Sequence, residues 1–172
     1  MSDDASAPVP PHAVIVGMIP DQPARVVREA ARYAALLQAP LVVAYVDVTR
    51  FVTYEDPDGY VHTAPIDLDV SPGESQFAAV KDAVAHALAG SPVAWSATSL
   101  VGDPALAIKH LAEQSDARLI VVGTRRRGFG ESVREFFTGS VAARLAHRQS
   151  RPILVVPLEA PAADDEELWP EG

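Results

Sequence analysis

The sequence predicts an α/β domain in which helices cover both faces of a parallel sheet. Two observations predict this fold class. Short runs that are almost purely apolar and rich in β-branched residues recur along the chain, as expected for strands buried on both faces. Helical patterns separate these runs, and strands that alternate with helices imply right-handed crossovers within one sheet. A length of 172 residues is sufficient for one domain with its own core.

Five segments are the expected strands of this sheet. Four of them are short apolar runs, at residues 13–16, 41–46, 119–122 and 153–156. The fifth, Val93–Val101, alternates apolar residues with exposed hydroxyl side chains. This alternation favours a strand at the edge of the sheet over a central one.

Four helical patterns lie between or after these strands. In the first, the apolar face is formed by Val26, Ala30, Tyr33 or Ala34, and Leu37. In the second, between Pro72 and Gly90, it is formed by Phe77, Val80, Val84 and Leu88. In the third, Asp103 is the expected N-cap and Pro104 the first helical residue, and the inward residues are Ala105, Ile108 and Leu111. The last helix is expected from about Ser140 to His147, with buried Val141, Ala142 and Leu145.

Residues 50–70 interrupt the alternation of strands and helices. Two β-rich pieces, Phe51–Tyr54 and Tyr60–Thr63, flank Asp56–Gly59. Because proline presets the backbone angle of a turn and glycine accepts a positive φ, this segment predicts a β-hairpin. It follows the carboxyl end of a strand, which is the ligand side of open α/β sheets. The hairpin is therefore either an inserted surface flap, or a lid or plug over that edge.

Charge is unevenly distributed along the chain. The formal net charge is −9, but residues 1–11 and 158–172 carry eight acidic residues and no basic one. We expect these two segments to be disordered tails around a domain of residues 12–157, and acidic tails usually solvate or interact weakly. Within the domain, Arg118–Arg151 contains eight arginines and only two acidic residues. This local excess of positive charge favours an anionic ligand.

Composition excludes several classes of protein. The chain contains no cysteine, which removes disulfides, thiol catalysis and thiolate metal sites. No run is apolar over the ~18 residues that a membrane span needs, and the amino-terminal residues lack the pattern of a secretory signal. A cytoplasmic protein without membrane contact is the expectation. The five histidines show no paired spacing for a metal, so no metal site is expected.

An anion site is expected where the strand at residues 119–122 ends. Gly123 allows a sharp turn and a close approach of the backbone, and amides at a following helix start favour negative charge. Ser140 can cap the last helix. Arg125, Arg126 and Arg127 either supply forked donors to phosphate oxygens or are simply solvated. No Gly-Lys-Ser/Thr follows Gly123, so a Walker loop is excluded.

Four segments of the sequence together resemble those of a known family: AVIVGM and VVREAARYAALLQAPLVVAYV near the start, VGDPALAIKHLAEQSDARLIVVGTRRR, and GSVAARLAHRQSRPILVVP at the end. Through these segments the chain resembles the universal stress protein family over about residues 12–157. The resemblance, to single-domain members of actinobacterial type, implies a Rossmann-like (HUP-type) five-stranded parallel sheet in the order 3-2-1-4-5. It places the crevice at the switch point between the first and fourth strands.

Members of this family that bind ATP use a loop of the form Gly-x2-Gly-x9-Gly-Ser/Thr. Gly123 matches its first glycine, and Gly139–Ser140 match its last pair. Arg126 stands where the second glycine is expected, and a positive φ is uncommon for such a side chain. The interval from Gly123 to Gly139 is also three residues longer than in the family. Gly128 or Gly130 would therefore replace the second glycine only by a different path.

The resemblance also implies residues for the base and the ribose. Val46 matches a position near adenine and Gly17 one beside the ribose, whereas the ribose-binding aspartate aligns with Ile19, two residues before Asp21. Ile19 cannot accept a hydrogen bond, and an unpaired ligand group costs about 1–3 kcal/mol. The expected binding residues are Gly17, Asp21, Val46, Gly123, Thr124, Arg125, Arg126, Gly128, Gly139, Ser140 and Val141.

Two functions remain open from the sequence. The first is a non-catalytic stress-response protein that binds an adenine nucleotide, ATP with Mg²⁺, or a related anion. The alternative is a family member that does not bind ATP and acts through contacts with an unknown protein partner, as Ile19, Arg126 and the hairpin favour. Slow nucleotide hydrolysis lacks a general base, and a nucleic-acid site lacks interleaved aromatic residues. The resemblance and the apolar edge at Ile153–Leu158 further imply a homodimer formed through the closing strand.

Overall fold

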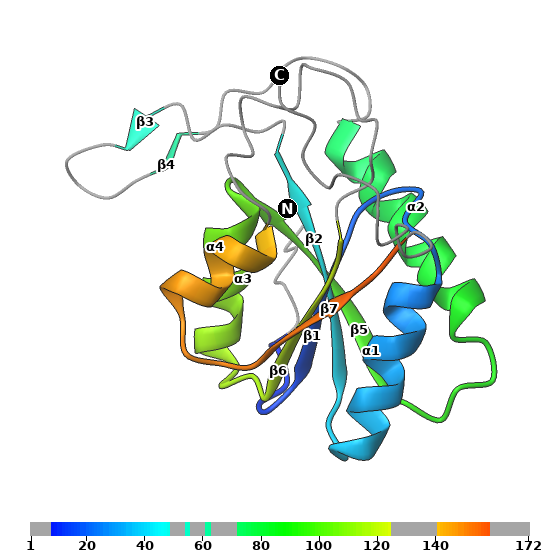
Figure 1. Cartoon of the computed structure of the whole chain (residues 1–172). Coiled ribbons are helices and arrows are strands. Elements are labelled where there is room, and N and C mark those ends of the chain that lie inside the picture. Colours follow the sequence, from blue (N-terminus) through cyan, green and yellow to red (C-terminus); the bar gives the residue numbers. More distant parts are fainter. Residues whose placement is uncertain (1–7, 49–53, 56–60, 63–71, 125–140, 159–172) are drawn as a thin grey trace, which may run out of the picture.

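The computed structural model describes residues 8–48, 54–55, 61–62, 72–124 and 141–158 (Figure 1). The strands of its main sheet are β1 (Val14–Met18), β2 (Leu41–Asp47), β5 (Trp95–Val101), β6 (Leu119–Gly123) and β7 (Ile153–Val156). The helices are α1 (Arg25–Leu36), α2 (Pro72–Ala87), α3 (Pro104–Gln114) and α4 (Val141–Arg148). Two short strands, β3 (Tyr54–Glu55) and β4 (Val61–His62), pair with each other outside this sheet.

The main sheet is parallel and has the order β5-β2-β1-β6-β7. Counted along the chain without the hairpin strands, this is the predicted order 3-2-1-4-5. β1 is central, because Val14 is in register with Leu41 of β2 on one side and with Leu119 of β6 on the other. β5 pairs with β2 and lies at one edge, as the alternating pattern of Val93–Val101 predicts. β7 forms the opposite edge.

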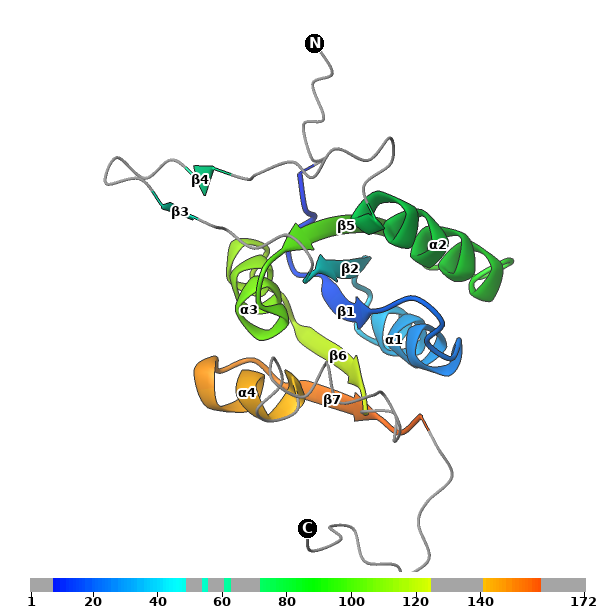
Figure 2. The same cartoon turned by 90° about the horizontal axis from the view of Figure 1, so that it is seen from above.

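Helices cover both faces of the sheet and form two apolar cores. Figure 2 shows α1 and α2 on one side of the strands and α3 and α4 on the other. Side chains alternate between the two faces along each strand. In β1, Val14, Val16 and Met18 belong to the core with α1 and α2, whereas Ile15 belongs to the core with α3 and α4. The predicted α/β fold class is therefore confirmed.

The first helix, α1, packs closely because its buried face consists of small residues. That face is formed by Val26, Val27, Ala30, Ala31 and Ala34, so of the two candidates Tyr33 and Ala34 the alanine is fully buried. The helix ends where Gln38 adopts a positive φ of 51° and its amide donates to the carbonyl of Ala35. This reversal directs the chain into β2.

One expectation about side-chain burial needs correction, and the hairpin is described only in part. Val141 and Ala142 are only half-buried, and Leu145 is the fully buried residue of α4. The reason is that an eight-residue helix at the border of the sheet covers little area. The hairpin strands pair antiparallel, Tyr54 with His62 and Glu55 with Val61, so the first strand extends to Glu55; the rest of the two predicted pieces and the Asp56–Gly59 turn lie outside the described residues. Val9 and Leu158, from the expected tails, pack against the two cores.

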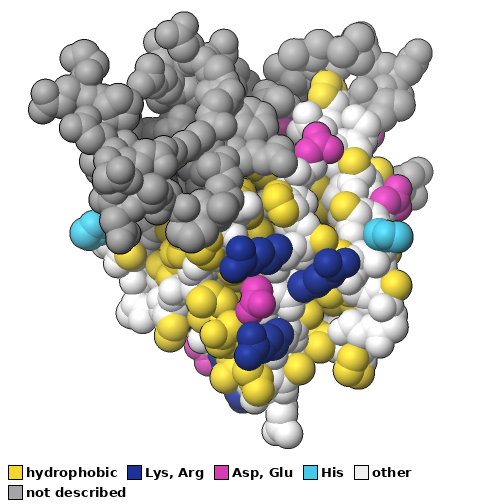
Figure 3. Space-filling view, turned by 45° about the vertical axis from the view of Figure 1, so that its right-hand side comes forward, with side chains coloured by type: hydrophobic (Ala, Val, Ile, Leu, Met, Phe, Trp, Pro, Cys, Tyr) yellow, Lys and Arg dark blue, Asp and Glu magenta, His cyan; other side chains and the backbone are white. Residues whose placement is uncertain are grey.

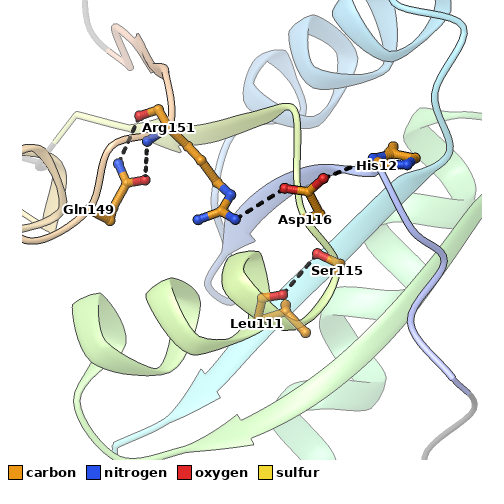
Figure 4. A network of polar contacts seen from close by, with 6 residues as sticks. All are labelled: His12, Leu111, Ser115, Asp116, Gln149 and Arg151. Atoms are coloured by element: carbon orange, nitrogen blue, oxygen red, sulfur yellow. Dashed lines mark hydrogen bonds and ion pairs between the residues drawn. The ribbon is translucent and has the colours of Figure 1, made fainter.

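A polar network secures the amino ends of the strands (Figure 4). Asp116, between α3 and β6, lies 3.3 Å from His12 Nδ1 through one oxygen and 3.3 Å from Arg151 Nη2 through the other. The amide of His12 donates to the carbonyl of Ser115 at 2.7 Å. Gln149 in turn holds the backbone of Arg151 from both sides. The network thereby joins the segment before β1, the connection from α3 to β6 and the connection from α4 to β7. It lies at the end of the sheet opposite to the predicted site.

Candidate ligand-binding site at the β1–β6 switch point

The chain changes direction across the sheet between β1 and β6. α1, which follows β1, covers one face, and α3, which leads into β6, covers the other (Figure 2). In open parallel sheets, the loops at such a point separate and leave room beyond the carboxyl ends of the strands. The carboxyl ends of β1 and β6 are at Met18 and Gly123. The predicted location of a crevice therefore coincides with the observed switch point.

Gly17 and Val46 lie on the face of the sheet that α3 covers. A Cβ on Gly17 would lie 3.1 Å from Ile108 Cδ1 of α3 and 3.6 Å from Val122 Cγ1 of β6. Val46 is 9% exposed and belongs to the same core as Ile108 and Val122. The missing side chain of Gly17 thus allows α3 to pack closely against the strand ends.

Gly123 faces the opposite side, toward α1. A Cβ at this position would lie 2.7 Å from Gln22 Nε2, 3.1 Å from Leu158 Cδ2 and 3.3 Å from Val26 Cγ2. The end of the flexible Gln22 side chain can move away from such a Cβ, but the contacts to Leu158 and Val26 would stay tighter than ordinary van der Waals contacts, so a larger residue crowds this position. The structure brings Gly17, Val46 and Gly123 to the same end of the sheet but not to the same face.

The loop after β1 closes on itself through Gln22. The side-chain oxygen of Gln22 accepts a hydrogen bond from the backbone amide of Ile19 at 2.9 Å, and the backbone amide of Gln22 donates to the carbonyl of Ile19. Pro20 follows Ile19, and Asp21 is exposed with a positive φ of 59°, the arrangement of a type II turn. Our sequence reasoning missed Gln22; the Pro-Asp pair before it was the available signal.

Thr124 connects the end of β6 to the closing strand. Its amide donates to the carbonyl of Val156 at 2.9 Å, and its hydroxyl accepts a hydrogen bond from the amide of Leu158 at 2.9 Å. Val141, half-buried, begins α4. The other expected site residues of this loop lie outside the described residues: Arg125, Arg126, Gly128, Gly139 and Ser140.

An ion pair positions α4 beside the start of α3. Asp103 caps α3 by accepting from the amide of Leu106 at 3.0 Å, as predicted, and Pro104 occupies the first turn. The other carboxylate oxygen of Asp103 lies 2.6 Å from Arg144 Nη1 of α4. Burial alone would raise the pKa of Asp103, but the bonds from Arg144 and Leu106 prevail and lower it. Because α3 begins shortly after β5 ends, this pair holds α4 at the end of the sheet where the strands have their carboxyl ends.

A second polar cluster holds α2 at the carboxyl end of β2. The hydroxyl of Tyr45 donates to Gln76 Oε1 of α2 at 2.6 Å. Asp47 is buried at 3% exposure, and a Cβ on Gly73 would overlap its carboxylate. Burial, and then the charge of Asp47, raises the pKa of Tyr45. Glycine at position 73 thus allows the start of α2 to contact a buried carboxylate.

The described part of the chain contains neither a group of side chains suited to a metal ion nor a helix suited to crossing a membrane. Its histidine, aspartate and glutamate side chains form no group of three or more that could hold a metal ion. None of its helices combines the length and apolar character that crossing a membrane requires.

Fold and switch point together define the class of this protein: an open, doubly wound α/β domain with the strand order 3-2-1-4-5. The model of the universal stress protein family matches residues 12–157, and the chain belongs to this family. A search among curated proteins finds no match.

Solved universal stress proteins share the fold. One in complex with cAMP is 23% identical with a TM-score of 0.56, covering 88% of this chain and 100% of that one. One from Archaeoglobus fulgidus in complex with dAMP is 20% identical with a TM-score of 0.53, covering 87% and 98%. UspA from Lactobacillus plantarum is 20% identical with a TM-score of 0.55, covering 86% and 99%.

Proposed function

We propose that this universal stress protein binds an adenine nucleotide, ATP with Mg²⁺ or a related anion, beyond the carboxyl ends of β1 and β6, without catalysing a reaction on it. The observation that carries the proposal is the switch point between β1 and β6. In the sequence, three arginines follow the end of β6 after Thr124. Open α/β sheets bind ligands at such points, and arginine forks match phosphate oxygens.

The choice of nucleotide is supported by relatives of the same fold. Of the solved proteins compared above, one is in complex with cAMP and another with dAMP. Both ligands combine adenine with a sugar phosphate. Adenine nucleotides are therefore the first ligands to test on this chain.

The donors to a phosphate would have to come from residues 125–140 and the start of α4. The amides of Ile19 and Thr124, which follow β1 and β6, are already bonded to Gln22 and Val156. Arg125 and Arg126 would supply charged donors, and the Asp103–Arg144 pair would keep the start of α4 in place for Gly139–Ser140. A helix start of this kind favours a negative charge.

Calorimetric titration with ATP and Mg²⁺ tests the proposal. We expect saturable binding that the R125Q/R126Q variant weakens by about tenfold or more, because each lost charged hydrogen bond is worth about 1.5–3 kcal/mol. The matched control is R25Q/R32Q, which removes two charges from the outer side of α1. Absence of heat at millimolar ATP, or equal weakening by both variants, would contradict the proposal. A phosphate-release assay that equals buffer is expected alongside.

Gln22 favours the alternative function, in which no nucleotide binds and the protein acts through protein contacts. Its side chain lies between the loop after β1 and the end of β6, bonded to Ile19 and close to Gly123. It thereby occupies space that a ligand would need. If Gln22→Ala creates ATP binding that the natural chain lacks, this alternative is the correct one.

We further propose that the protein forms a homodimer through Ile153–Leu158. β7 is one of the two edge strands of the sheet, and Val155 within it is 44% exposed. An apolar edge strand with unpaired backbone groups favours pairing with another chain. An isologous contact between two copies of β7 would satisfy these groups across a two-fold axis.

A further inference from the structure

The outer side of α1 carries a row of basic residues next to an apolar groove. Arg25, Arg28 and Arg32 are exposed and spaced by three and four residues, so they lie on one face of the helix. The acidic residue among them is Glu29, which lies 3.7 Å from Arg32. Figure 3, which brings this side forward, shows basic side chains around an acidic one. We call Arg25, Arg28 and Arg32 the basic row.

The groove runs between α1 and the end of α2. It has a volume of about 310 Å³, and its lining includes Arg28, Ala31, Arg32, Ala35, Leu88 and Pro92. Arg28 reaches across it, because its Nε donates to the carbonyl of Ala87 at 3.4 Å. Leu36, one turn after Arg32, is 68% exposed. An apolar surface with a basic border therefore lies open on this side of the molecule.

The last described residue before the carboxyl-terminal segment lies at the start of α1. Leu158 packs against the core formed with α1 and α2. A Cβ added to Gly123 would lie 3.1 Å from Leu158 Cδ2 and 3.3 Å from Val26 Cγ2, in the first turn of α1. The side chains of Leu158 and Val26 are therefore close to each other. The chain thus continues into residues 159–172 from the same end of α1 at which the basic row begins.

Residues 159–172 have the complementary chemistry. They contain six acidic residues and no basic one, and Leu168 and Trp169 directly follow the acidic run Asp164–Glu167. We propose that this segment docks on its own domain, with Asp164–Glu167 against the basic row and Leu168–Trp169 in the groove between α1 and α2. Tryptophan suits such a site because it buries a large area for few rotatable bonds.

The lengths are compatible with this path. α1 has 12 residues, which corresponds to about 18 Å. Trp169 comes eleven residues after Leu158, and an extended segment of that length spans at most about 36–40 Å. Single exposed ion pairs are weak, but a tethered segment acts at an effective concentration in the millimolar range. Weak contacts are therefore sufficient to keep it docked.

A fluorescent label in the groove tests the docking, because the chain contains no cysteine. Ala35→Cys places a bimane label on an exposed lining residue, and tryptophan quenches bimane at short range. If the segment is docked in more than half of the molecules, less than half of the label remains unquenched. Adding Trp169→Phe should then raise the fluorescence about twofold or more. The same pair of measurements with Ala146→Cys, on exposed α4, should show no difference.

Charge and concentration distinguish the possible outcomes. Raising the salt from about 0.01 M to about 1 M shortens the Debye length from about 30 Å to about 3 Å, so quenching should decrease. R25Q/R32Q should decrease it as well, whereas K109Q/R148Q, a two-charge change on α3 and α4, should not. Equal fluorescence of the groove label with and without Trp169 would overturn the proposal. Quenching that grows with protein concentration would also overturn it, since the segment would then dock on a second copy.

Discussion

Arg144 of α4 lies 2.6 Å from Asp103, the residue that caps α3. Each oxygen of the carboxylate has its own partner, one the amide of Leu106 and the other the guanidinium of Arg144. The side chains of Asp103 and Arg144 are 29% and 21% exposed, respectively, so solvent screens the pair only partly. A single aspartate therefore begins one helix and holds a second helix next to the proposed ligand site.

A double-mutant cycle on this pair should show coupling. Asp103→Ala should lower the free energy of unfolding by about 1–2 kcal/mol through the lost cap, with a further loss from the ion pair. Asp103→Asn should cost less, because asparagine still caps. We expect a coupling of about 1 kcal/mol between Asp103→Ala and Arg144→Ala in urea unfolding. The control pair Lys109–Glu113, 3.7 Å apart on α3, should give about 0.3–0.5 kcal/mol. Equal coupling in both cycles would contradict this interpretation.

The same carboxylate should make stability depend on acid pH. The pKa of Asp103 is lowered in the folded protein from its ordinary value of 3.8, so the unfolded chain binds the proton first as the pH falls. The stabilisation is therefore fully present above pH 3.8 and is lost as the pH falls through the lowered pKa. Unfolding measured across this range should show a shallower acid loss for Asp103→Asn. An unchanged pH profile in that variant would assign the acid sensitivity to other groups.

Val155→Lys should convert the proposed dimer into a monomer. The substitution places a charge on the exposed edge strand β7, and charged residues on an edge oppose pairing with another chain. Light scattering at micromolar concentration gives the mass of each form. Val101, 41% exposed on the other edge strand, supplies the control, and Val101→Lys should leave the dimer intact. A monomeric natural chain, or dissociation by the control alone, would exclude β7 as the interface.

Ile19→Asp should strengthen nucleotide binding. Ile19 is 52% exposed and stands where family resemblance implies a carboxylate for the ribose, so the change provides a hydrogen-bond acceptor without disturbing the core. We expect about tenfold higher affinity for ATP by calorimetry, equivalent to about 1.4 kcal/mol. Ile19→Ala, which adds no acceptor, should leave the affinity unchanged. Similar affinities in the two variants would show that this position does not contact the ribose.

Local patterns determined much of the fold. The apolar runs specified four strands of the sheet, the alternating pattern specified the fifth, and the Asp103-Pro104 pair specified the start of α3, because these signals act over a few neighbouring residues. The alternation of Val93–Val101 was sufficient to place it at an edge. The family resemblance added the strand order, and with it the position of the switch point.

The roles of individual site residues were decided by the tertiary structure. Gly17 and Gly123 look alike in the sequence, but one accommodates α3 and the other accommodates Gln22 and α1. Which helix each glycine meets depends on the alternation of side chains along a strand and on the face that each crossover covers. Asp103 and Arg144 are 41 positions apart, and no local pattern connects them. The sequence by itself thus determined which segments form strands and helices, whereas only the folded chain determined which side chains meet, because such contacts join residues that are distant along the chain.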